Sequence, residues 1–149
     1  MEKIFNKIDI FYGLVVMLFA DTFGKYWYLF AAFLFLNVCD YITGIIKAKY
    51  THTENSNKGL KGIIKKVGYW LVIAISFFIA QFFGSMGDII GMDLGFTSLI
   101  GYFTLATFII NEMRSILENL VELGVNVPSW LIKGLEAASK TIEDKNKKE

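Results

Sequence analysis

The hydrophobic positions of the chain gather in long, nearly unbroken runs rather than in short alternating ones. Three runs have membrane-spanning length: residues 26–46 give 21 positions, and residues 67–83 and 94–110 give 17 each. A helix needs about 20 apolar residues, within a range of about 17–25, to cross the hydrocarbon core of a bilayer. The pattern therefore predicts an all-α integral membrane protein with three transmembrane helices.

A fourth and shorter hydrophobic run lies near the start of the chain. It covers residues 10–20, or residues 8–23 at its widest. Its short length favours a helix in the membrane interface, with three crossings and an outward-facing N-terminus. The positive charges of Lys3 and Lys7 favour a fourth crossing and a cytoplasmic N-terminus instead. We predict an interfacial or a fourth membrane helix here, and the length argument leads us to prefer the interfacial one.

The hydrophobic pattern changes after the third long run. Gly124 is a natural helix terminator, Pro128 follows as a stop, and Ser129 is suited to cap a last helix. Apolar residues then recur at the spacing of an amphipathic helix, at Leu131, Leu135, Ala138 and Ile142. The sequence predicts a membrane domain over residues 1–128. Residues 129–149 are predicted to form an amphipathic cytoplasmic helix and a charged tail, with the helix on the bilayer or against a neighbouring subunit.

The composition supports a membrane protein. Hydrophobic residues make up 54% of the chain and the mean hydropathy is +0.48, whereas soluble domains contain about 45–50% apolar residues. A chain of 149 residues is too short to bury so much apolar surface in one core. Glu2 and Asp9 interrupt the N-terminal region, and no cleavage signature of a signal peptide follows. The first hydrophobic segments are therefore expected to stay in the mature protein.

The charges between the hydrophobic runs predict which side of the membrane each loop faces. The segment 84–93 contains Asp88 and Asp93 and no Lys or Arg, whereas the segment 47–66 contains six lysines against Glu54. Loops rich in Lys and Arg stay in the cytoplasm. The lysine-rich loop and the C-terminus are therefore predicted to be cytoplasmic, and the 84–93 turn to face outward. The residues expected to set this topology are Lys47, Lys49, Lys58, Lys61, Lys65 and Lys66.

Polar residues interrupt the first hydrophobic run on one side of the helix. At about 100° per residue, Asn37, Asp40 and Gly44 fall on a single stripe. An ionised carboxylate at the centre of a bilayer costs about 2.5–3.5 kcal/mol, so Asp40 should face another helix or water, pair with a cation, or stay protonated. Pairing with a lysine and facing a pore are both open for Asp40.

The third run carries a similar stripe of small and polar residues that includes Asn111 and Ser115 and continues beyond the membrane through Glu118 and Glu122. Such residues let membrane helices approach closely and form hydrogen bonds across the contact. Two stripes in one small protein suggest an assembly or lumen face, and packing within the single chain is the alternative. The residues proposed for this face are Asn37, Asp40, Gly44, Thr97, Gly101 and Thr104.

The sequence lacks the patterns of a catalytic or cofactor site. His52 is the only histidine and Cys39 the only cysteine, so no metal site is predicted. Solvation or pairing with Arg114 explains Glu112 and Glu118 more simply than catalysis. A net charge of +1 provides no basic excess for binding nucleic acid. We therefore predict no enzyme, no cofactor, no metal and no nucleic-acid partner.

Three sequence blocks together resemble one known family. Residues 40–48 read DYITGIIKA, residues 56–66 read SNKGLKGIIKK, and residues 111–119 read NEMRSILEN, followed by LGVNVP at residues 123–128. In this order and spacing, between hydrophobic runs, the blocks resemble the toxin-secretion/phage-lysis holins over roughly residues 26–135. The third block contributes the family-motif residues Asn111, Glu112, Ser115, Glu118, Asn119 and Pro128.

The resemblance implies a phage-derived protein of the bacterial cytoplasmic membrane. Its partners would be the lipid bilayer and other copies of itself, which assemble into a homo-oligomer. The resulting pore would release a cytosolic murein hydrolase (an endolysin) so that the host cell lyses. A similar non-lytic pore for exporting a toxin or bacteriocin is the alternative, and a small membrane scaffold or accessory subunit without a pore is another.

Overall fold

The structure, a computed structural model, describes the backbone of residues 2–146. Side chains are described from Ile8 to Asp144, apart from residues 22, 25 and 143. The side chains of Lys3 and Lys7, and the end of the charged tail, therefore lie outside the described residues. The described chain is built from helices without a strand, as the sequence predicts, and its long helices are α1 (Glu2–Phe23), α2 (Trp27–Tyr50), α3 (Ser56–Ile90), α4 (Ser98–Glu122) and α5 (Ser129–Asn146).

Three helical segments among the described residues are long and apolar enough to cross a membrane. They are Trp27–Tyr50, Ser56–Ile90 and Gly95–Glu122, the last of which joins a short 3-10 turn to α4. Apart from Tyr26 and Leu94, these segments contain the three predicted hydrophobic runs, so the prediction of three helices suited to spanning a membrane is confirmed. Each helix is longer than its hydrophobic run, because helical structure continues into polar sequence where the hydropathy no longer marks it.

Local residues set helix ends at three of the connections. Asn55 precedes α3, and its side-chain oxygen accepts hydrogen bonds from the backbone N–H groups of Asn57 and Lys58, which satisfies donors that a helix start leaves free. Gly91 ends α3 with a φ of 72°, and Gly124 follows α4 with a φ of 84°. Both adopt the left-handed conformation that favours glycine, so the prediction that Gly124 terminates a helix is confirmed.

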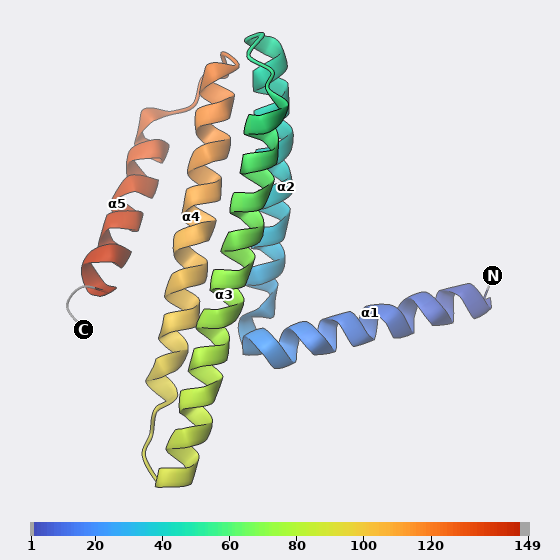
Figure 1. Ribbon diagram of the computed structural model, residues 1–149, viewed down its shortest axis with the longest axis vertical. Helices are drawn as coiled ribbons and strands as arrows, with labels where there is room; N and C mark the ends of the chain where they lie inside the picture. Colours follow the sequence, from blue (N-terminus) through green and yellow to red (C-terminus); the bar gives the residue numbers. More distant parts are fainter. Residues whose placement is uncertain (1, 147–149) are drawn as a thin grey trace.

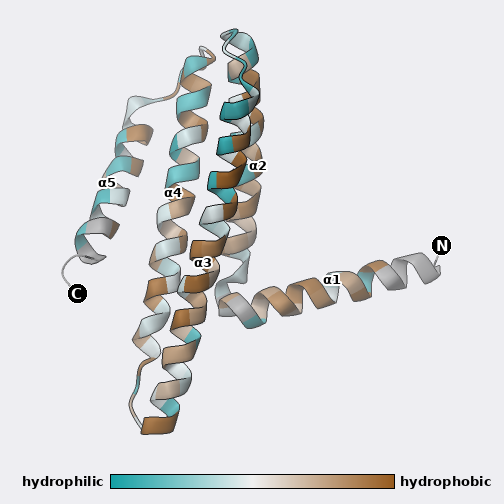
Figure 2. Cartoon of the chain, viewed as in Figure 1, coloured by the Kyte–Doolittle hydropathy of each residue, from teal (hydrophilic) through white to brown (hydrophobic). Residues whose placement is uncertain are grey.

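The three long helices lie side by side, with α4 packed along both α2 and α3 (Figure 1). Their shared core is aromatic and aliphatic, and Phe23 at the end of α1 joins it. The Phe23 and Phe30 rings stack with centroids 4.1 Å apart, and Phe77 meets Phe23 edge-on at 5.1 Å. Figure 2 shows hydrophilic residues at the end of the bundle that carries the α2–α3 loop, residues 51–55. We call this end the loop end.

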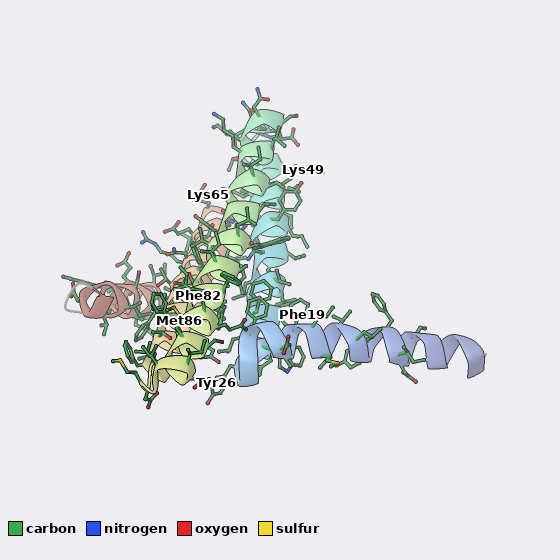
Figure 3. The ribbon with its side chains drawn as sticks, turned by 60° about the horizontal axis from the view of Figure 1, so that its bottom comes forward. Phe19, Tyr26, Lys49, Lys65, Phe82 and Met86 are labelled. Atoms are coloured by element: carbon green, nitrogen blue, oxygen red, sulfur yellow. The ribbon has the colours of Figure 1, made fainter. Side chains whose placement is uncertain are left out.

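The first helix leaves the bundle sideways at the start of α2 (Figures 1 and 3). Its C-terminal part is anchored: Phe19 and Phe23 lie against Phe30 of α2. The Gln81 side chain of α3 donates a hydrogen bond to the carbonyl oxygen of Asp21 at 3.0 Å. The apolar side chains of residues 8–14 are exposed. Helix α1 is not among the three candidate spans, and its interfacial placement stays a prediction.

The last helix lies beside α4 (Figure 1). Arg114 of α4 approaches Glu136 of α5 at 3.8 Å. Of the predicted apolar stripe, Leu131, Leu135 and Ile142 are half-buried and Ala138 is exposed. The amphipathic face is therefore covered in part by the same chain. Its relation to a bilayer, and the domain division after residue 128, stay predictions.

The contact between α3 and α4 depends on one glycine and makes a testable prediction. A Cβ atom added to Gly101 would lie 2.8 Å from the ring of Phe77, closer than side chains tolerate. We expect Gly101→Ala to lower the free energy of unfolding in detergent by about 1–3 kcal/mol, the usual cost of overpacking. Gly68→Ala is the matched control, because a Cβ there meets nothing within 4 Å. Equal thermal stability of the two variants would contradict the packing argument.

Candidate functional site

Three charged side chains from three different helices meet inside the bundle. The Nζ atom of Lys66 on α3 lies 2.9 Å from Oδ2 of Asp40 on α2, and it also pairs with the carboxylate of Glu112 on α4. The side chains are 15%, 15% and 4% exposed for Lys66, Asp40 and Glu112. We call these three residues the charged triad. It connects all three candidate spans through a single ammonium group.

A neighbouring amide completes the hydrogen bonding of Asp40. Asn119 of α4 is buried, and its Nδ2 donates to Oδ1 of Asp40 at 3.0 Å and to Oγ1 of Thr43 at 3.1 Å. The Thr43 hydroxyl in turn donates to the backbone oxygen of Asp40 at 3.1 Å. Each carboxylate oxygen of Asp40 therefore has a partner on another helix, one on α3 and one on α4.

A second polar contact joins α2 to α3, about one helical turn from Asp40. Asn37 is buried and donates from Nδ2 to the Phe33 carbonyl oxygen at 2.8 Å. Its Oδ1 accepts a hydrogen bond from Nε1 of Trp70 at 3.3 Å. Together with the charged triad, Asn119 and Thr43, this pair forms what we call the polar network. Among the described residues, no buried side-chain nitrogen or oxygen lacks a hydrogen-bond partner.

Small residues let the helices approach at the network. Gly44 faces Asn119, because a Cβ added to Gly44 would lie 3.8 Å from its Nδ2. On α3, Lys66 shares a helical stripe with Ile73, Phe77 and Ala80, all of which are buried. Lys66 therefore points inward although its neighbours in sequence are exposed. Lys65 instead places its ammonium group 5.6 Å from the ring centre of Tyr69.

The charge balance makes Lys66 the critical member of the network. Two carboxylates face one ammonium group, so removal of the lysine would leave both negative charges without a cation on the described partners. Moving charges out of water carries a large desolvation penalty, which a buried ion pair offsets only when both partners are present. The network therefore stabilises one arrangement of α2, α3 and α4.

The other residues predicted for an assembly or lumen face lie elsewhere along the bundle. Thr97 is buried at the opposite end of α4 and donates to the Ala80 carbonyl oxygen at 3.2 Å. Gly101 is buried against Phe77, and Thr104 donates within its own helix to the Ile100 carbonyl oxygen. The structure brings Asn37, Asp40 and Gly44 together but not with these three. A role in assembly stays a prediction for all six.

The predicted topology-setting lysines all lie towards the loop end, but their surroundings differ. Lys47 pairs with Glu122 at 3.3 Å. Lys66 belongs to the charged triad and Lys65 lies near Tyr69, whereas the remaining three are exposed: Lys49, Lys58 and Lys61. Their role in topology stays a prediction.

The family-motif residues also lie in different surroundings. Glu112 and Asn119 belong to the polar network, and Asn111 and Ser115 line a cleft beside the triad. Glu118 is exposed, and Pro128 directly precedes α5. Arg114 binds Glu118 at 2.8 Å, so the expected pairing is confirmed for Glu118. It is wrong for Glu112, which pairs with Lys66, because residues two apart on a helix do not face each other.

Two clefts open beside the charged triad, and both are lined by Asp40 and Lys66. One, of about 380 Å³, lies against α3 and α4 and includes Tyr69 and Glu112; the other, of about 650 Å³, also includes residues of α2 and the loop 51–55. No group of His, Cys, Asp or Glu in the described part of the chain has the geometry of a metal site. The contacts of the charged triad join the three helices.

Comparison with known proteins gives a consistent result. Residues 6–140 match the bacteriophage holin family. The chain is 32% identical over 130 residues to a probable holin of Bacillus phage phi105, covering 87% of each protein. It is 34% identical over 141 residues to an uncharacterized 14.9 kDa protein in the nagH 3′ region of Clostridium perfringens, covering 91% of this chain and 96% of the relative. No solved structure matches the chain.

Proposed function

The chain belongs to the bacteriophage holin family, and from this membership we propose that it assembles with copies of itself into a pore in the bacterial cytoplasmic membrane. The pore would release a cytosolic murein hydrolase and so lead to host lysis. The observation that carries the proposal is the similarity to a protein named a probable holin, which extends over 87% of both chains. The three apolar helices support a multi-pass membrane protein.

The orientation in this proposal follows the distribution of charge. The loop end of the bundle carries the topology-setting lysines, whereas Asp88 lies near the opposite end of α3 and Asp93 in the turn after it. The positive-inside rule then supports a cytoplasmic loop end and C-terminus. In that orientation the charged triad lies on the cytoplasmic side of the spans.

The polar network suggests how the separate chain stays closed before assembly. Asp40 has its partners on α3 and α4 of the same chain. Its predicted place on an assembly or lumen face therefore requires these contacts to open and be replaced by water or by another copy. In this proposal the network holds the three spans together until enough copies have accumulated to exchange contacts.

The proposal is tested by inducible expression in a bacterium while the membrane potential and culture density are followed. We expect an abrupt loss of potential after a delay, and lysis only when an active murein hydrolase is co-expressed. The matched control expresses the same chain with a catalytically inactive hydrolase. Continued growth with an intact potential at high expression would contradict pore formation. Depolarisation without lysis beside the active hydrolase would contradict hydrolase release and favour a smaller export pore.

A further inference from the structure

The larger of the two clefts extends beyond the polar network. Helices α2 and α3 both pack on α4 and leave the cleft between them at the loop end. Its volume is about 650 Å³, its floor includes Ser115 and Asn119 of α4, and the loop 51–55 contributes Thr53, Glu54 and Asn55. The cleft therefore runs from the charged triad to the end of the bundle.

The charges that line this cleft are not fully paired. Four lysines contribute: Lys47, Lys49, Lys58 and Lys66. Glu122 pairs with Lys47, and Asp40 pairs with Lys66. Lys49 and Lys58 are exposed and form no ion pair with any described residue. Among the carboxylates that line the cleft, Glu54 also forms no ion pair with a described residue. At the outer end of the cleft, Lys49 and Lys58 outnumber Glu54 and leave an excess of one positive charge. At its inner end, Lys66 is shared between Asp40 and Glu112.

The walls of the cleft also offer apolar surface and open space. Tyr41 and Ile45 of α2 line it and are exposed. On the opposite wall α3 presents Gly59 and Gly62, and a Cβ atom added to either meets nothing within 4 Å. The cleft thus combines ammonium groups, apolar side chains and a wall without side-chain bulk.

We propose that this cleft binds the phosphodiester headgroup of an anionic glycerophospholipid. A phosphodiester carries one negative charge, which matches the excess positive charge, and Tyr41 and Ile45 would contact the start of an acyl chain. Basic pockets between transmembrane helices on the cytoplasmic side are suited to anionic lipid headgroups. The proposal rests on the membrane orientation given above but not on pore formation, because a chain that forms no pore would retain the cleft.

The test measures lipid binding to the purified full chain in detergent by native mass spectrometry, with phosphatidylglycerol as the probe. Removing one lysine charge should weaken binding about fivefold, so Lys49→Gln and Lys58→Gln should each show that loss. Lys61→Gln is the matched control, because Lys61 is exposed on α3 but does not line the cleft. An equal loss in Lys61→Gln would indicate diffuse attraction and overturn the site.

Three further arms separate a lipid site from a general anion site and from non-specific adsorption of lipid. Gly59→Leu fills the cleft without changing charge and should weaken phosphatidylglycerol binding while leaving thermal stability unchanged. Phosphatidylcholine should bind more weakly than phosphatidylglycerol, and inorganic phosphate should not displace the lipid. Unchanged binding in Gly59→Leu, equal binding of phosphatidylcholine, or displacement by inorganic phosphate would each overturn the proposal. Failure of the depolarisation experiment would leave these results unaffected.

Discussion

Replacing Lys66 with methionine is expected to lower the free energy of unfolding by about 3–5 kcal/mol, the cost of removing one partner of a buried ion pair. Methionine retains much of the length of the lysine side chain but leaves Asp40 and Glu112 without their shared cation. The effect should be large because Glu112 is almost fully buried. The measurement is unfolding of the purified protein in detergent, followed by circular dichroism.

The neighbouring lysine provides a matched control for this substitution. Lys65→Met removes the same charge one position earlier, but Lys65 is exposed beside Tyr69 and outside the charged triad. Its effect on stability should be small. Adding Glu112→Gln to Lys66→Met should recover part of the loss, because it removes one of the two uncompensated carboxylates. Equal destabilisation by Lys65→Met and Lys66→Met would contradict the role assigned to the triad.

Replacing Asp40 with leucine is expected to shorten the delay before depolarisation during expression in a bacterium. The change removes the contacts of Asp40 with Lys66 and Asn119, and it disturbs the link to Thr43. Polar contacts between membrane helices contribute about 0.6 kcal/mol on average and up to about 1.7. Losing two such contacts raises the equilibrium constant for separation of the helices by about tenfold. The apolar side chain should still allow membrane insertion.

The comparison variant for this experiment is Asp88→Leu. Asp88 lies on α3 near the end opposite the polar network and is exposed, so its loss should leave the delay unchanged. Immunoblots of membrane fractions check that all chains accumulate equally. If Asp40→Leu triggers at the same time as the wild type, then Asp40 has no part in assembly, and its carboxylate serves only the fold.

The membrane spans were predictable from sequence because crossing a bilayer is a local requirement. About 20 apolar residues in a row satisfy it whatever the rest of the chain does. The start of α3 was not predictable in this way: it begins at Ser56, eleven positions before the hydrophobic run at residue 67, since Asn55 caps a polar helical extension. Hydropathy gives no signal for helix outside the hydrocarbon region.

The charged triad was predictable only in part. Helical periodicity placed Asp40 on a stripe with Asn37 and Gly44, and a lysine was one of the partners expected for it. The choice of Lys66 over five other lysines depends on which face of α3 meets α4, and this is a property of the packed helices. One signal was present in the sequence: Lys66 is in phase with Ile73, Phe77 and Ala80, all of which are buried.

The length of α3 has a consequence for the bilayer itself. Its 35 residues rise about 52 Å at about 1.5 Å per residue, but the hydrophobic run 67–83 accounts for only about 26 Å of this, against a hydrocarbon core of about 30 Å. A run shorter than the core favours local thinning of the surrounding bilayer, at a cost of fractions of a kcal/mol for each Å of mismatch. Neighbouring copies share one deformed patch of lipid, so elastic relaxation of the bilayer favours their clustering, and most strongly where the membrane is thick.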